Sequence, residues 1–124
     1  MVTDLTEACE RIRKSDPRIM SLILADADGT KLAHSYGPEY EKEYMESAAA
    51  IRSRAGLLAV VMMGMTQGSE DAFGKTEAIV RLHKNISVVI FSTPSRKKVI
   101  TMVTTKDADV RSILPKVRPL IKGL

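Results

Sequence analysis

The sequence predicts an α/β domain, an α+β sandwich built on a five-stranded antiparallel sheet. Strand-length apolar runs follow one another with hairpin-length connections, which favours antiparallel pairing. Several runs are apolar at nearly every position, and such strands need helices on both faces of the sheet. Segments with helical periodicity lie at the start, middle and end of the chain. The expected order is therefore α-β-β-α-β-β-β-α, with the long central helix on one face and the terminal helices on the other.

Length and composition indicate one globular domain spanning residues 1–124. Apolar residues make up 44% of the chain and charged residues 27%, which is typical of a globular domain and not of a disordered one. The single cysteine, Cys9, has no partner for an internal disulfide and is expected in the core. No secretory leader is seen, and the longest apolar stretch is about half of a membrane span. The expected compartment is the cytoplasm.

The N-terminal segment predicts a short amphipathic helix. Thr3 or Asp4 can cap its first turn, and Glu7 can reach back as in a capping box. The helix should end at Ser15-Asp16-Pro17, since a proline disfavours a helical residue before it.

Two strands follow, Ile19–Ala25 and Thr30–Tyr36. The first is almost wholly apolar, which is typical of a strand buried on both faces. Asp28-Gly29 between them predicts a type I′ hairpin turn, because both residues tolerate a positive φ.

A long helix is predicted from Glu39 to about Gln67, with a polar loop from Gly68 to Gly74. Glutamates cluster at the helix start, where negative charge suits the helix dipole. The apolar residues recur at spacings of three and four, as on one face of a helix: Tyr44, Ala48, Ile51, Ala55, Leu58, Met62 and Met65.

The remaining chain predicts three more strands and a last helix. The strands are Glu77–His83, Ile86–Thr93 and Val99–Thr105. The helix should start at Asp107 with Asp109 in its first turn, and Pro115 and Pro119 should kink or shorten it.

The functional argument starts from the second half of the long helix. Every residue from Ala55 to Met65 is apolar or glycine. A helix on a sheet buries one face only, so a helix that is apolar all round needs cover on its other face too. No spare element is left in the chain to supply this cover, so a second chain is expected to do so. Gly56 and Gly64 would let that second helix approach closely, and an antiparallel pair across a two-fold axis is the simplest closed arrangement.

These residues resemble the roadblock/LC7 family over essentially the whole chain. The resemblance lies in the strand and turn Ser21–Gly29, the alanine-rich helix from Ser47 to Met65, and the segments Asn85–Phe91 and Val99–Val103 with Asp107. It implies a homodimer in which the long helices pair and the third strands, here Glu77–His83, pair edge to edge. It also implies a non-catalytic regulator or scaffold that binds a Ras-like small GTPase through the long helix.

The expected site is therefore a protein interface, with no catalytic residue, metal ligand or cofactor. The expected dimer interface comprises Ala55, Gly56, Leu57, Val60, Val61, Met63, Gly64, Ile79 and Arg81. The expected partner-binding residues are Tyr40, Tyr44, Ile51 and Arg52. The start of the helix, Glu39–Tyr44, is more acidic than the family pattern, and no arginine can be assigned as a catalytic finger.

One alternative is a Mg²⁺-dependent phosphatase of the haloacid-dehalogenase type. Asp26 and Asp28 follow an apolar strand as the nucleophile and general acid of that chemistry do, and Phe91-Ser92-Thr93 is similar to its second motif. The chemistry also needs a later lysine and a carboxylate pair at separate strand ends of a parallel sheet. Asp107 and Asp109 follow Lys106 too closely to supply them.

Gly74-Lys75-Thr76 is similar to the end of a phosphate-binding loop, but Ser69 replaces the first glycine and the expected element order is reversed. His34 and His83 lack metal-ligand spacing.

A second alternative is a basic nucleic-acid-binding protein. Residues 75–124 carry a net charge of +8, against −4 for residues 1–74. The cations that could contact phosphates are Arg96, Lys97, Lys98, Lys116, Arg118 and Lys122. No stacking pair of aromatics accompanies them, so a solvated basic face remains the simpler interpretation.

Overall fold

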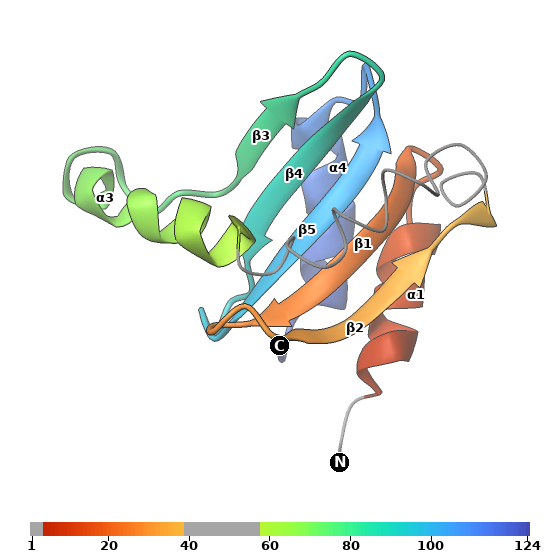
Figure 1. Cartoon of the computed structure of the whole chain (residues 1–124), viewed down its shortest axis with the longest axis horizontal. Helices are drawn as coiled ribbons and strands as arrows, with labels where there is room; N and C mark the ends of the chain where they lie inside the picture. The colour runs from red at the N-terminus through yellow and green to blue at the C-terminus, as the bar shows by residue number, and fades with distance from the viewer. Residues whose placement is uncertain (1–3, 39–57) are drawn as a thin grey trace.

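The computed structural model describes residues 4–38 and 58–124, and these contain the predicted five-stranded antiparallel sheet (Figure 1). The spatial order of the strands is β2-β1-β5-β4-β3. All four neighbouring pairs are antiparallel. The strands are β1 (Ile19–Asp26), β2 (Lys31–Tyr36), β3 (Ile79–Leu82), β4 (Ile86–Ser92) and β5 (Lys98–Thr105).

The terminal helices cover one face of the sheet, as predicted. They are α1 (Leu5–Lys14) and α4 (Val110–Val117), and α4 continues into the 3₁₀ turn η1 (Arg118–Leu120). Their apolar faces meet the strands in the main core, which includes Ile12, Leu22, Leu24, Val89, Phe91, Ile100, Met102, Ile113 and Val117. Cys9 lies in this core, and burial raises the pKa of its thiol to about 11. The thiol therefore stays protonated at neutral pH.

The described end of the predicted long helix lies on the opposite face. Residues 58–65 are helical, and Ala59 and Met63 pack in a second core cluster with Ile90 and Val99. The part of that predicted helix between residues 39 and 57 lies outside the described residues. No helix in the described ranges is long and apolar enough to cross a membrane.

The prediction of a polar loop from Gly68 to Gly74 is wrong, because α3 (Gln67–Phe73) forms there. The Thr66 hydroxyl donates to the Met63 carbonyl oxygen (2.7 Å) where the preceding helix ends. No residue of α3 is buried, so the apolar periodicity that identifies helices in a sequence is missing. Gly74 ends the helix with a φ of 83°, and Glu70 holds it to Arg96 by a two-bond ion pair with a shortest distance of 2.7 Å.

The β1–β2 turn differs from the predicted type I′ turn. That turn needs a positive φ at both central residues, and only Gly29 has one (90°). The Gly29 amide donates to the Asp26 carbonyl (2.9 Å), and the Asp26 amide donates to the Thr30 carbonyl (2.8 Å). This is the three-residue hairpin loop in which a left-handed glycine completes a type I turn. The Asp28 carboxylate accepts from the Thr30 amide (2.9 Å), which lowers the pKa of Asp28.

Both described terminal helices are capped by aspartate. Asp4 accepts from the Thr6 and Glu7 amides, whereas the Glu7 side chain bonds Arg11 (2.9 Å) and does not form the predicted capping box. Asp109 is the residue before α4 and caps it, so the prediction that it lies in the first turn is wrong. The helix ends at Val117, and Pro119 lies in η1, which confirms the predicted shortening.

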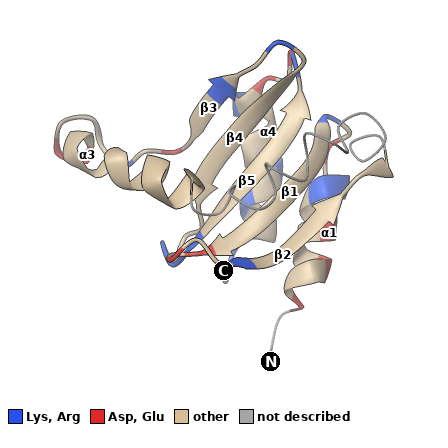
Figure 2. Cartoon of the chain, in the orientation of Figure 1, with Lys and Arg blue, Asp and Glu red and all other residues tan. Residues whose placement is uncertain are grey.

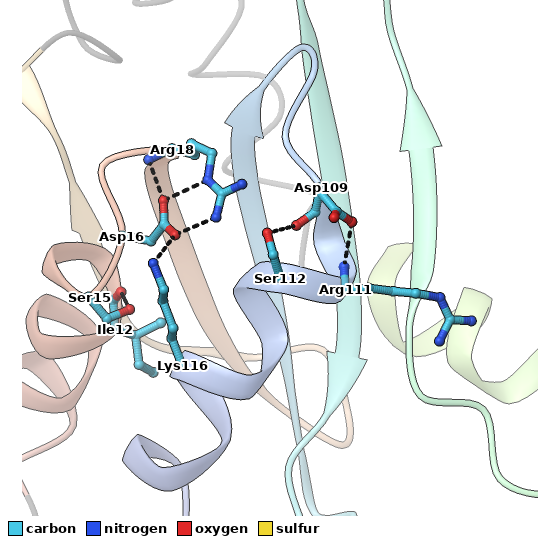
Figure 3. A network of polar contacts seen from close by, with 8 residues as sticks. All are labelled: Ile12, Ser15, Asp16, Arg18, Asp109, Arg111, Ser112 and Lys116. Carbon is cyan, nitrogen blue, oxygen red and sulfur yellow. Dashed lines mark hydrogen bonds and ion pairs between the residues drawn. The ribbon is translucent and has the colours of Figure 1, made fainter.

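A buried carboxylate ties the two terminal helices together. Asp16, only 1% exposed, follows α1. It accepts two hydrogen bonds from the Arg18 guanidinium (2.9 and 2.7 Å) and one from the Lys116 ammonium of α4 (3.0 Å) (Figure 3). Arg18 above all, with Lys116, holds the pKa of Asp16 far below its usual range, although burial opposes this shift.

We expect Asp16→Asn to lower the free energy of unfolding by about 2 kcal/mol at pH 7, because charge-assisted hydrogen bonds are lost. Folding lowers the pKa of Asp16, so its contribution is complete above its unfolded-state pKa of about 4 and is lost as pH falls toward the folded value. Urea titrations at pH 7 and below pH 4 measure the difference between variant and wild type. Glu10→Gln, at an exposed position of α1, is the matched control. A difference of equal size at both pH values would contradict the assigned role.

Candidate functional site

The helical segment 58–65 has two apolar faces. Ala59 and Met63 point into the protomer core, with exposures of 1% and 8%. Leu58, Val61 and Met65 are 44%, 52% and 78% exposed. Their spacing of three and four residues places these three on one outer face of the helix. We call this set the outer stripe.

Gly64 lies beside the outer stripe and faces open space. A Cβ added there would meet no atom within 4 Å. A glycine inside a helix costs about 1 kcal/mol relative to alanine, and no contact within the described residues explains it. Close approach of another helix would do so.

Within residues 4–38 and 58–124, strand β3 is an edge of the sheet. Its neighbour there is β4, with Ile79 opposite Ile90 and Leu82 opposite Ser87. Val80 is 43% exposed and Leu82 is 80% exposed. An apolar edge strand with free amide and carbonyl groups is a template for pairing with another chain.

The predicted interface residues fall into three groups. Val61 and Gly64 are exposed on the outer side of the helix. Val60, Ile79 and Arg81 are half-buried, whereas Met63 packs inward against the sheet. The other predicted residues lie outside the described ones: Ala55, Gly56, Leu57, Tyr40, Tyr44, Ile51 and Arg52.

Sequence reasoning missed Leu58 and Met65 on the helix and Val80 and Leu82 on the strand. No polar residue between positions 55 and 65 marks the solvent side, so the rotation of the helix about its axis could not be set. For β3, the alternation of Val80 and Leu82 with Arg81 was a usable signal.

The residues of the phosphatase alternative serve a turn in this structure. The Asp26 carboxylate accepts from the Ala27 amide (2.9 Å), and Asp28 bonds Thr30 as described above. Both lie in an antiparallel hairpin, not at the ends of parallel strands.

The phosphate-loop likeness also has its elements reversed, because Gly74-Lys75-Thr76 follows a helix and precedes a strand. Nowhere in residues 4–38 and 58–124 do three potential metal-ligating side chains come together.

Three of the basic residues considered for nucleic-acid binding form ion pairs. Arg96 pairs with Glu70, Lys116 with Asp16, and Arg118 with Glu77 at 3.4 Å. Figure 2 shows Lys and Arg spread over strand ends, turns and helices, with acidic residues among them. In this view the described basic residues are not gathered in one region.

These features define an α+β domain with exposed apolar surface on a helix and an edge strand, and comparison with known proteins identifies its fold. No protein-family profile matches the sequence, and no curated protein is significantly similar to it. A roadblock/LC7 domain from Streptomyces avermitilis superposes with a TM-score of 0.71 at 14% identity, over 98% of this chain and 94% of that one. Myxococcus xanthus MglB gives 0.68 at 12% identity, over 97% and 90%. Acanthamoeba castellanii profilin IB gives 0.59 at 11% identity, over 97% and 95%. The chain thus has the roadblock/LC7 fold, which it shares in outline with profilin.

The two faces of segment 58–65 should respond differently to truncation. We expect Met63→Ala to lower the free energy of unfolding by about 2–4 kcal/mol, because it leaves a cavity above Ile90. Met65→Ala, at a position 78% exposed, should cost under about 0.5 kcal/mol in the protomer. Urea unfolding at low protein concentration, where a dimer would dissociate, measures both. Equal costs would show that the helix is rotated differently.

Proposed function

We propose that this chain is a single roadblock-type domain that acts as a homodimeric, non-catalytic regulator or scaffold of a Ras-like small GTPase in the cytoplasm. The observation that carries the proposal is the outer stripe, Leu58, Val61 and Met65, an apolar helix face exposed on a second side. An exposed apolar helix face of this kind favours cover by another chain.

The energetic argument is local. Full burial of a Leu, Val or Met side chain stabilises by about 1.5–3 kcal/mol. The outer stripe is about half exposed or more at each position, so its burial would contribute roughly 3–5 kcal/mol per protomer. Since a two-fold axis presents the same stripe from both chains, one self-complementary contact gains this twice.

The β3 edge supports the same arrangement. In Figure 1, β3 is at the edge of the sheet that is nearer to segment 58–65. Antiparallel pairing of β3 with its copy would satisfy the free backbone groups of both edges and join two sheets. Ile79 and Arg81 would then lie at the centre of the interface, with Val60, Val61 and Gly64 close by on the helix.

The GTPase part of the proposal rests on the roadblock/LC7 resemblance and on the structural likeness to a roadblock/LC7 domain and to MglB. Prokaryotic roadblock domains of the kind resembled regulate Ras-like small GTPases. Tyr40, Tyr44, Ile51 and Arg52 are the residues proposed to contact such a partner.

We expect Val61→Asp to convert the dimer to monomers, because a carboxylate would be buried without a partner in the helix pair. Sedimentation velocity should give a dimer of twice 13.6 kDa for wild type and a monomer for the variant. Thr6→Asp, at an exposed position of α1 on the opposite face, is the matched control and should stay dimeric. A persistent dimer in Val61→Asp would contradict the proposed interface.

Gly64→Ala is a second variant that does not depend on a charge. Alanine fits the open space at this position and should stabilise the isolated protomer by about 0.5–1 kcal/mol. In a close helix pair the added methyl groups should weaken dimerisation. Tighter dimerisation together with higher protomer stability would rule out close approach at Gly64.

The partner is tested with a purified prokaryotic Ras-like small GTPase, loaded with GDP or with a non-hydrolysable GTP analogue. We expect the wild-type chain to retain the GTPase in one nucleotide state at least tenfold more strongly than in the other, since a regulator must distinguish the states. Arg52→Glu should abolish retention while the dimer persists. Equal retention in both states would exclude a nucleotide-dependent regulator.

A further inference from the structure

On the side of the sheet that carries α1 and α4, no helix of the described residues lies above β3. A helix with its side chains is about 10 Å wide, and strands are about 4.8 Å apart, so two helices cover about four strands. Val89 of β4, which lies opposite Val80 of β3, is completely buried, whereas Val80 is 43% exposed. Leu82, two residues further along the same face, is 80% exposed. The two helices on this face therefore leave β3 uncovered.

The uncovered space is a groove of about 690 Å³ between β3 and α4. Its apolar lining comprises Phe73, Ala78, Val80, Val110 and Leu114. A volume of this size lies within the range of ligand-binding clefts. Val80 of β3 lines one side of the groove and Val110 and Leu114 of α4 the other, and the segment that leads from α3 into β3 closes one end. The groove therefore lies beside α4 where β3 lacks cover from the described helices.

The charged residues at the rim of the groove favour an acidic ligand. Glu77 is paired with Arg118, and the Asp109 carboxylate accepts the Arg111 amide (3.1 Å) as the cap of α4. Glu77 is thus paired with a cation, and the charge of Asp109 interacts with the Arg18 guanidinium. The Arg111 side chain is exposed, makes no salt bridge with any described residue, and extends from the start of α4 away from Asp109 (Figure 3). Lys75 lies at the same rim. The positive groups left for a ligand favour acidic flanking residues.

We propose that this groove binds an amphipathic helix of a partner protein, with its apolar ridge on Val80 and Leu114 and carboxylates beside Arg111. The proposal builds on the interaction role proposed above but uses the opposite face of the sheet from the outer stripe. A helix fits better than an extended peptide, because a peptide strand would pair with the β3 edge and compete with the proposed dimer. A bound helix would occupy the third position of the layer formed by α1 and α4.

The test uses a fluorescein-labelled designed helix of 18 residues, with leucines at i, i+3, i+4 and i+7 spacing and glutamates flanking them. A matched peptide carries lysines in place of the glutamates. Fluorescence anisotropy with the full chain should show saturable binding of the acidic peptide and weaker binding of the basic one. Equal binding of both peptides, or binding of neither, would overturn the proposal.

Arg111→Glu tests the charge term at an exposed position that should not disturb folding. It should weaken the acidic peptide about threefold to tenfold, the effect of replacing an exposed attraction by a repulsion, and should strengthen the basic peptide. Val80→Glu should weaken both peptides at least tenfold, with circular dichroism confirming the fold. An unchanged acidic-peptide affinity in Arg111→Glu would sink the proposed site.

Two further measurements separate this site from the dimer. Val61→Asp monomers should still bind the acidic peptide, because the groove lies within one protomer. Peptide binding by a wild-type chain that sediments as a monomer would count against the dimer alone, whereas a dimer that binds no peptide would count against the groove alone. A dimer that persists in Val61→Asp but is lost in Val80→Glu would show that a second copy fills the groove and would refute a partner helix.

Discussion

A sheet that is apolar on both faces needs cover on both, and the number of available helices decides which strands remain in contact with water. In this chain β1 and β5 are at the centre and are buried throughout most of their length. Strand β3 is at the edge, four residues long, and alternates half-buried with exposed positions. The exposed apolar surface therefore follows from the topology, because β3 is the outermost strand and α4 does not cover it.

The Asp16 ion cluster links the two terminal helices. Asp16 lies at the turn between α1 and β1, and its bond to Lys116 joins α1, β1 and α4 across 100 residues of sequence. A buried carboxylate is tolerated because Arg18 and Lys116 satisfy its oxygens. This contact ties α4 to the α1–β1 turn, while Ile113, Leu114 and Val117 pack α4 onto the sheet. The ion cluster and the apolar core together place the terminal helices side by side.

The sequence predicted what depends on local pattern and missed what depends on tertiary position. The strand beginning at Ile19 was predictable because its apolar run has the length of a buried strand and is bounded by Pro17 and Asp26. Helix α3 was missed because it buries nothing, and its tie to Arg96 joins residues 26 positions apart. The inward orientation of Met63 was also missed, since an all-apolar segment does not show which side faces the sheet. The type of the β1–β2 turn could not be predicted, because an aspartate such as Asp28 can adopt either a negative or a positive φ.

The fold alone does not decide the function. This chain shares it with a roadblock/LC7 domain at 14% sequence identity and, in outline, with a profilin at 11%. The structural roles of the acidic side chains bear on the function more directly. In the described residues Asp4 and Asp109 cap helices, Asp28 holds a turn, and Asp16 and Glu70 form ion pairs. These groups stabilise the protein's own backbone and side chains. The large apolar side chains on the outer stripe and on β3 are different, because they remain exposed in the described structure. Apolar surface of this kind binds other proteins, which agrees with the interaction role proposed above.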